Sequence, residues 1–272
     1  MAHSIDPDLD NLLLDSDSDD INILIDHITA KGDGRISLSA ESCAQLVLAK
    51  ASGRVSPEDV ALISQELRKF GGNTLLNLFR RGRGVAYKEL LCDVADHLKV
   101  NYNKNSDCPK IEMVILLKVL EESIDRMTEQ EREALFNSLG ANFTGTGPLM
   151  MASLQAAIKA SGFAAYKLSA IVAQATSTAI LGRGLVFTTT APLMRGAGAF
   201  AGPIGWAITG IWTVFDLASP AYRVTVPCVV QIAYMRQKAY SAQEKEGRCP
   251  QCDTPVSSSA KFCGECGCRL KN

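Results

Sequence analysis

Charge is scarce over one long stretch of this sequence. Only five of the 89 residues between Glu133 and Arg223 carry a charged side chain, about 6%, against 21% for the whole chain. A run with so few charges cannot easily cover itself with water, so an ordinary exposed surface is excluded. The stretch is therefore either the buried core of a helical protein or a segment that meets lipid. The choice between these two bears directly on function.

Catalytic motifs are also missing. The chain has three histidines, His3, His27 and His97, and no HExxH, GxSxG or P-loop pattern. A Gly196-x-Gly198-x-x-Ala201 pattern does occur. It follows no predicted strand of a βαβ unit, which a dinucleotide site needs, and close helix packing is the commoner reason for such glycines. These absences argue against an enzyme.

The N-terminus lacks the basic region and the apolar core of a secretory signal peptide. Four of the nine cysteines form one cluster, and most of the others are scattered along the chain. This distribution is typical of a reducing compartment and does not suit a disulfide framework. We expect a cytoplasmic protein, peripheral to the inner membrane or conditionally inserted in it.

The two halves of the chain differ in charge. Residues 1–140 carry 24 acidic and 16 basic side chains, whereas residues 141–272 carry 5 and 12. The basic half holds the charge-poor stretch, so its expected partners are anionic membrane lipids or an inner-membrane protein. No Lys/Arg stripe is interleaved with aromatic residues, and no nucleic acid partner is expected. Homo-oligomerisation stays open.

Helical signals dominate the N-terminal half. Apolar residues recur at steps of three and four up to Phe70, after a Ser56-Pro57 pair that is typical of a helix start. Thr128 and Glu131 have the spacing of a capping box. No convincing alternation of apolar and polar residues precedes the last 25 residues. The predicted fold is all-α: a multi-helix bundle with a low-charge Gly/Ala-rich helical hairpin and a small C-terminal zinc ribbon.

Breaks in composition divide the chain into five parts. We expect a short acidic helical domain, a second helical domain, an apolar Gly/Ala-rich helical region, a polar linker and a zinc ribbon. Their predicted bounds are residues 1–50, 51–140, 141–240, 241–248 and 249–272.

The C-terminal cysteines carry the clearest chemistry. Two Cys-x-x-Cys pairs are separated by ten residues, a spacing that lets four thiolates surround one Zn²⁺ tetrahedrally. The other interpretation is a pair of redox dithiols, which two pairs at this spacing seldom are. Four thiolates close the coordination sphere, so the ion would be structural, and Cys268 could compete as a ligand. The predicted ligands are Cys249, Cys252, Cys263 and Cys266.

The second half of the charge-poor stretch contains one run of membrane-spanning length. Gly196 to Phe215 is 20 residues without charge, but it is rich in Ala, Gly and Thr and would insert only marginally. Its glycines have small-xxx-small spacing, which serves close helix packing in either environment. Insertion and a packed core both stay open. The residues assigned to this membrane or packing hairpin are Gly196, Gly198, Gly202, Gly205, Trp206 and Trp212.

Several segments together resemble one bacterial family. They are residues 66–73, 81–87, 90–95, 202–205 and 221–233. The chain resembles the YaaW-like family, often labelled ubiquinol-cytochrome c chaperone-like, over roughly residues 6–240. The zinc ribbon is an addition that simpler members lack. The resemblance brings no catalytic residue, and it singles out a motif formed by Gly71, Gly72, Tyr222, Arg223 and Pro227.

Two functions remain in competition at this point. In the first, a non-enzymatic protein inserts its hairpin into the inner membrane or perturbs it, as a pore-forming effector of stress or phage defence would, and the ribbon serves as a sensor or docking module. In the second, a helical chaperone or assembly adaptor uses the apolar stretch as its own core. The two differ in whether residues 149–215 are enclosed by other helices.

Overall fold

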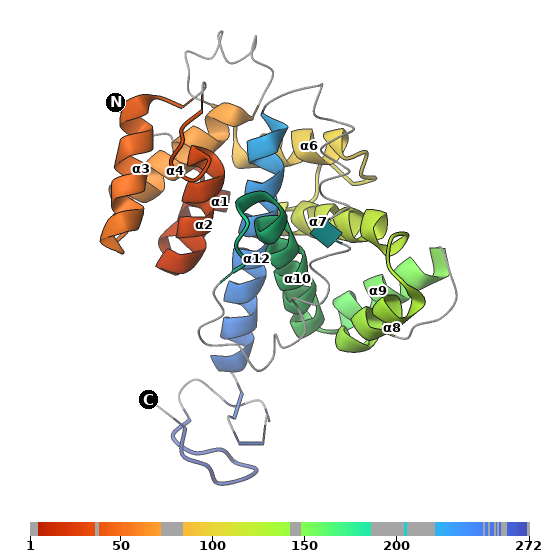
Figure 1. The fold of residues 1–272 in the computed structure, drawn as a ribbon. Helices are drawn as coiled ribbons and strands as arrows, with labels where there is room; N and C mark the ends of the chain where they lie inside the picture. The colour runs from red at the N-terminus through yellow and green to blue at the C-terminus, as the bar shows by residue number, and fades with distance from the viewer. Residues whose placement is uncertain are drawn as a thin grey trace.

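The fold was analysed in a computed structural model (Figure 1). It describes residues 5–35, 38–71, 84–141, 148–185, 204–205 and 221–246, and residues 248–249, 251–252, 254, 256 and 260–270 of the C-terminal module. The predicted all-α class is confirmed. The described helices are α1 (Pro7–Leu14), α2 (Ser18–Thr29), α3 (Ala40–Ser52), α4 (Pro57–Phe70), α6 (Tyr87–His97), α7 (Cys108–Ile124), α8 (Glu129–Ser138), α9 (Pro148–Ala160), α10 (Gly162–Leu181) and α12 (Tyr222–Glu246).

Local capping chemistry fixes several helix starts where the sequence predicts them. Ser56 caps α4 and forms a reciprocal capping box with Asp59, ahead of Pro57 at the first helical position. Thr128 and Glu131 form the same box at the start of α8. Each box satisfies two backbone N–H groups that the first turn of a helix leaves without an intrahelical partner. Both predicted starts are confirmed.

The charge-poor stretch begins as two helices. Ser161 ends α9 and caps α10 by accepting a hydrogen bond from the N–H of Ala164. At the other end α10 stops at Gly182, whose φ of +68° is a conformation that glycine adopts without a Cβ penalty. Glycine thus marks the end of α10 in the sequence, whereas the break at Ser161 carries no strong sequence signal.

Helices α10 and α12 lie side by side at the centre of the bundle. Figure 1 shows α1 to α4 on one side of this pair and α6 to α9 on the other. Thirteen of the 20 residues of α10 are buried, among them Tyr166, Leu168 and Ile171. A helix that is apolar on nearly every side is stable in water only where other helices surround it. Helix α10, within the charge-poor stretch, is therefore bundle core.

A short piece of the predicted hairpin packs against the same helix. Ile204 is buried, and a Cβ placed on Gly205 would lie 3.6 Å from the Cβ of Ala179 and 3.9 Å from the carbonyl oxygen of Ala175. Small residues on both sides permit this close approach. The other hairpin residues singled out from the sequence, Gly196, Gly198, Gly202, Trp206 and Trp212, lie outside the described residues.

Within the part of the chain that the structure describes, no helix combines the length and the apolar character that a bilayer crossing requires. The membrane-inserting interpretation therefore finds no support in the described helices. Leu149 to Leu181, which the sequence leaves open between core and lipid, divides into α9 and the enclosed α10. A buried bundle helix and a membrane helix share the same lack of charge, and this similarity explains the ambiguity.

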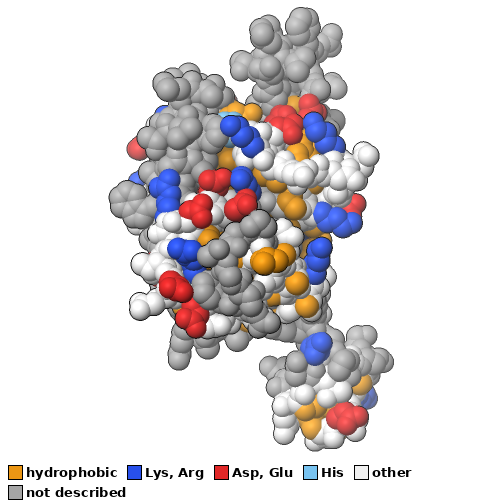
Figure 2. All heavy atoms as spheres, turned by 90° about the vertical axis from the view of Figure 1, so that its right-hand side faces the viewer, with side chains coloured by type: hydrophobic (Ala, Val, Ile, Leu, Met, Phe, Trp, Pro, Cys, Tyr) orange, Lys and Arg blue, Asp and Glu red, His pale blue; other side chains and the backbone are white. Residues whose placement is uncertain are grey.

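Helix α12 is longer than the sequence indicates. It continues to Glu246 and so runs through most of the expected polar linker 241–248. Residues 241–246 read Ser-Ala-Gln-Glu-Lys-Glu and include five strong helix formers, so their polarity is as typical of a helix end as of a linker. The small C-terminal module follows at once and forms a separate lobe beyond the bundle (Figure 2).

The central position of α10 predicts a large loss of stability when its core is truncated. Ile171 is 0% exposed, and Ile171→Ala should lower the free energy of unfolding by about 2–5 kcal/mol because it leaves a cavity. Leu149→Ala is the matched control, since Leu149 lies on α9 in the same charge-poor stretch and is 73% exposed; its cost should stay within about 0.5 kcal/mol. Denaturant unfolding of both variants measures the difference, and equal losses would contradict a core role for α10.

Candidate functional site

The four predicted zinc ligands converge in the C-terminal module. The sulfur atoms of Cys249, Cys252, Cys263 and Cys266 all lie within 4.8 Å of one another. Two pairs, Cys249–Cys266 and Cys252–Cys263, have Sγ–Sγ distances of 3.5 Å. Four ligands at zinc–sulfur distances of about 2.3 Å in a tetrahedron would stand about 3.8 Å apart, close to this arrangement. The donor set and its spacing fit a structural zinc ion.

Backbone hydrogen bonds shape the two cysteine turns. In the first, the N–H of Cys249 donates to the carbonyl of Thr254 at 2.9 Å, and the N–H of Gln251 donates to the Cys249 sulfur at 3.4 Å. In the second, the N–H of Gly267 donates to the carbonyl of Cys263 at 3.0 Å, with Gly267 at a φ of +70°. Turns of this kind point thiols and N–H groups into one small volume. Gly264, between the two cysteines of this pair, does not have a positive φ.

The hydrogen bonds around these thiols set their protonation. Bonds from the hydroxyl and the N–H of Thr254 lower the pKa of Cys252 to about 6. Burial opposes ionisation of Cys249, but the N–H groups of Cys252 and Gln251 outweigh it and lower its pKa. The N–H of Cys268 favours the thiolate of Cys266, whereas bonds with neighbouring thiols raise the pKa of Cys266 to about 12. The protein thus prepares thiolates at one side of the cluster, and a bound cation would supply the charge that four thiolates need.

The module has little other means of staying folded. Among its described residues, the buried apolar side chains are Cys249, Cys263 and Leu270, and the only described strand-like pairing is the isolated bridge between Phe262 and Arg269. Three buried side chains cannot offset the conformational entropy of such a chain, so a metal ion would supply the folding free energy. With four thiolate ligands no coordination position remains for a substrate, which makes the centre structural.

The family-motif residues lie in the bundle, apart from the cysteine cluster. Gly71 ends α4 so close to α6 that an added Cβ would lie 2.7 Å from Val85 Cγ2. Tyr222 stacks on His97 with ring centroids 3.6 Å apart. Pro227 lies inside α12, Arg223 is exposed in its first turn, and Gly72 is outside the described residues. Gly71 and Tyr222 therefore serve packing between helices, and a functional role for Arg223 stays a prediction.

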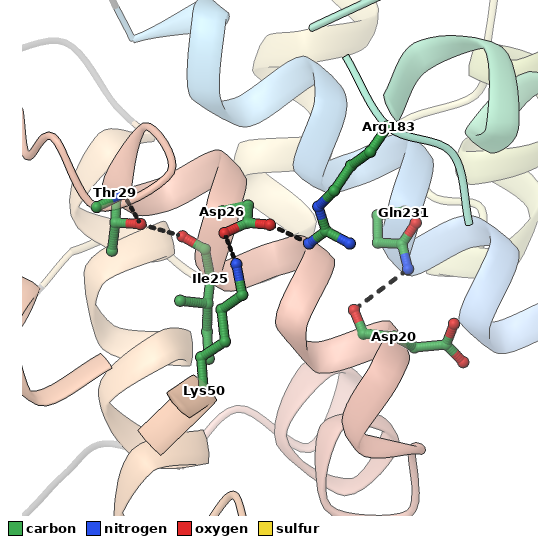
Figure 3. Close-up of polar contacts among 8 residues, drawn as sticks. Asp20, Ile25, Asp26, Thr29, Lys50, Arg183 and Gln231 are labelled. Carbon is green, nitrogen blue, oxygen red and sulfur yellow. Dashed lines mark hydrogen bonds and ion pairs between the residues drawn. The ribbon is translucent and has the colours of Figure 1, made fainter. Parts of the chain in front are cut away.

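Sequence reasoning missed a buried ionic cluster at the end of α10. Asp26 on α2 is 1% exposed and forms ion pairs with both Lys50 of α3 and Arg183, which directly follows the α10 C-cap (Figure 3). Gln231 of α12 donates to the carbonyl of Asp20 nearby. The only signal in the sequence is that Arg183 is one of five charges in 89 residues. Charges this rare are retained where a buried partner requires them.

A second buried ion pair joins four helices. The guanidinium of Arg236 on α12 donates to Glu112 of α7 at 2.8 Å and to the carbonyl of Asp8 on α1 at 2.7 Å. The hydroxyl of Tyr87 on α6 donates to the same carboxylate at 2.8 Å. Burial raises the pKa of Glu112, while Arg236 acts against this rise. A carboxylate held by an arginine and a tyrosine has no vacant position for a substrate, so this cluster acts as a structural cross-link.

The fold and the cysteine cluster define a class of protein: a helical bundle that carries a C-terminal zinc-ribbon module. The family can now be stated as well. This chain belongs to the ubiquinol-cytochrome C chaperone family, whose model matches residues 61–230.

Curated relatives agree with the family assignment. The chain is similar to a UPF0174 protein of Helicobacter pylori, with 38% identity over 248 residues that cover 90% of this chain and 96% of the relative. A second Helicobacter pylori UPF0174 protein is 42% identical over 182 residues, covering 65% of this chain and 87% of the relative. The UPF0174 protein YaaW of Escherichia coli is 31% identical over 185 residues, covering 67% and 73%. No solved structure matches.

The cysteine geometry predicts about one zinc ion per full-length chain. Removal of the ion by a chelator should unfold the module and leave the helical far-ultraviolet circular dichroism of the bundle nearly unchanged. Cys249→Ser should lose the ion, whereas Cys92→Ser on α6 should keep it, because Cys92 lies outside the cluster. Elemental analysis of the purified chains gives the stoichiometry. A metal content that Cys249→Ser leaves unchanged would contradict the assigned centre.

The buried His27 predicts a specific pH dependence. Burial lowers its pKa to about 3, with Asp26 opposing and Arg35 and Arg183 adding to the shift, and neither ring nitrogen has a hydrogen-bond partner among the described residues. The folded protein therefore keeps His27 neutral where the unfolded chain protonates it below about pH 6.5. Since the unfolded state then binds more protons, the free energy of unfolding falls as the pH falls.

Between pH 6.5 and 5.0 the His27 contribution should lower the free energy of unfolding by about 1.5 kcal/mol. Urea unfolding at both pH values, in the wild type and in His27→Phe, isolates this contribution. The wild type should lose more stability than the variant over the interval by that amount. Identical losses would show that His27 is not held neutral in the folded state.

Proposed function

We propose that this protein is a non-enzymatic helical chaperone or assembly adaptor, with the charge-poor stretch as its own core and the zinc ribbon as the surface that docks a partner protein. The burial of α10 carries the proposal. The predicted hairpin residue Gly205 packs against α10, and Tyr166, Leu168 and Ile171 of α10 are buried by other helices, so insertion of the hairpin would have to break a contact with the bundle core. Extraction of such a helix would expose its apolar surface to water, at a free-energy cost of about 25 cal/mol for each Å² exposed.

The polar clusters support a function without catalysis. Glu112 is fully used by Arg236 and Tyr87, and Asp26 by Lys50 and Arg183. Catalytic groups need a position open to substrate, and in the described residues these buried acids have none. The cysteine centre likewise leaves no coordination position for a substrate, because four thiolates would surround the ion. What remains for function is the surface of the bundle and of the ribbon.

The family description supports a protein as the partner. It names a chaperone for ubiquinol-cytochrome c, so we infer that the partner is a protein of the inner membrane that this chain meets from the cytoplasmic side. The ribbon is well placed for docking, because it forms a separate lobe (Figure 2). It exposes Phe262, which follows the basic Lys261 in the chain and forms an isolated bridge with Arg269. Aromatic and arginine side chains are enriched where proteins bind one another.

Photo-crosslinking from the ribbon tests the proposal. A photoreactive residue at Phe262, which is 60% exposed, should give an adduct with one inner-membrane protein in cells. The added Cys263→Ser substitution should abolish the adduct, because it removes a metal ligand and unfolds the module, whereas Cys92→Ser should not change it. The captured protein, once purified, should bind the wild-type chain and fail to bind the Cys263→Ser chain.

A flotation experiment distinguishes this proposal from the competing function, membrane insertion. Purified full-length protein is mixed with anionic liposomes that hold a fluorescent dye. The adaptor proposal expects the protein to stay at the bottom of the gradient without dye release, and the amides of residues 162–181 to exchange slowly in the lipid-free protein. Flotation with dye leakage would overturn the proposal and favour membrane insertion through Gly196 to Phe215. A crosslinked adduct that persists in the Cys263→Ser variant would show that the folded ribbon is not the docking surface.

A further inference from the structure

Helix α3 carries an apolar stripe that the rest of the described chain leaves exposed. The helix lies at the outer edge of the bundle and packs mainly against α2 and α4 (Figure 1). Val47 and Leu48 are both exposed on it, and Leu48 is 68% exposed. Among the described large apolar side chains, they are the only exposed pair that is adjacent in the sequence. Single exposed apolar side chains are normal on a protein surface, whereas a contiguous group of them marks an interaction surface.

Small residues extend this stripe in both directions. Ala44 precedes Val47 by three residues, Ala51 follows Leu48 by three residues, and both alanines are exposed. Steps of three and four residues keep side chains on one side of a helix. The stripe therefore has an alanine at each end and the two larger side chains at its middle. Short side chains at the ends of a contact allow a second helix to pack at the lower end of the usual distance of about 8–10 Å between helix axes.

The polar side chains of α3 beside the stripe already have partners within the chain. Gln45 donates to the carboxylate of Asp59 on α4 at 2.9 Å. The hydroxyl of Ser42 donates to Glu66 of the same helix at 3.1 Å. These contacts hold α3 on α4 through its polar edge. They leave the apolar stripe as the part of the helix surface that is available for a partner.

Opposite charges stand at equal distances beyond the two ends of the stripe. Glu41 lies six residues before Val47, and Arg54 lies six residues after Leu48. Both charged residues are exposed, and neither forms an ion pair with another residue that the structure describes. The stripe and its flanking charges are therefore complementary to their own reversed copy. Such self-complementarity is what a two-fold symmetric contact between identical chains requires.

We propose that the stripe is the contact between two copies of this chain, with the two α3 helices antiparallel about a two-fold axis that passes between Val47 and Leu48. The axis brings these larger side chains together at the centre of the contact. It also brings Ala44 of each copy to the partner's Ala51, where short side chains let the helices close up.

The flanking charges select the antiparallel direction. In this arrangement Glu41 of each copy lies beside the partner's Arg54, so two ion pairs of opposite charge form at the rim. A parallel arrangement would place Glu41 beside the partner's Glu41, and like charges in contact disfavour it. Ion pairs exposed at a rim add little to affinity and are screened by salt, so their main effect is on orientation.

The contact is small, and the dimer is therefore weak. Helix α3 has 13 residues, which at 1.5 Å each make a length of about 20 Å. One face of such a helix buries less than the roughly 800 Å² per partner of a standard interface. The expected dissociation constant is about 1–100 μM.

Sedimentation velocity of the full-length protein, at concentrations on both sides of this range, tests the inference. The wild type should pass from monomer to dimer as the concentration rises. Leu48→Glu should weaken the dimer at least about tenfold, because two like charges then meet at the axis. Leu149→Glu is the matched control, since Leu149 is an equally exposed leucine on α9, and it should leave the dissociation constant unchanged. Circular dichroism verifies that each variant keeps its helices.

A charge exchange tests the antiparallel arrangement separately. At low salt Glu41→Arg should weaken the dimer by about three- to tenfold, because it places two cations together at each end of the contact. The double variant Glu41→Arg/Arg54→Glu should restore the wild-type dissociation constant, since it reverses both charges of each pair. Higher salt should reduce the difference between the single and the double variant.

Three outcomes would overturn the inference. A wild type that stays monomeric at every concentration shows that no second copy covers the stripe, and liposome binding that Leu48→Glu abolishes would then assign the stripe to lipid. A dimer that Leu48→Glu leaves unchanged uses another surface of the chain. A dimer that Leu48→Glu weakens but the charge exchange does not restore has a different arrangement from the antiparallel one. The proposed docking role of the ribbon stands or falls independently of these results.

Discussion

The packing of α10 against α12 is the contact on which the rest of the structure depends. Helix α10 contacts α12 and other helices, and it buries small residues such as Ala170 and Ala173, which permit close approach between helices. The same feature explains why the stretch is poor in charge, because a helix surrounded by other helices has no face to solvate. Two buried acids are paired with arginines in this region, Asp26 with Arg183 and Glu112 with Arg236. These pairs fix the helices in one arrangement at a desolvation cost that the apolar core offsets.

The local parts of this architecture could be predicted from the sequence, and the tertiary parts could not. Ser56 and Thr128 start helices because their side chains satisfy nearby N–H groups, and the cysteine spacing alone indicates the metal centre. Lack of charge does not tell a bundle core from a membrane segment, because both environments exclude water. The pairing of Asp26 with Arg183 joins residues far apart in the chain, and no local pattern encodes it. Likewise, the polar end of α12 looks like a linker until its helical propensity is weighed.

The C-terminal module and the bundle differ in size, and they obtain their folding free energy in different ways. The bundle buries a large apolar core. The module buries Cys249, Cys263 and Leu270, and a cation shared by its four clustered thiolates would supply its folding free energy. Metal supply would then control the module while the bundle persists, so the two parts could be regulated separately within one chain.

The length of α12 has a mechanical consequence. Twenty-five residues at 1.5 Å each make a rod of about 37 Å, and the module begins two residues beyond its end. The rod starts in the core beside α10 and carries the ribbon at its tip, as Figure 1 shows. A partner that pulls on the ribbon would therefore pull on the central helix of the bundle. A force on the ribbon would thus be transmitted along α12 to the core of the bundle.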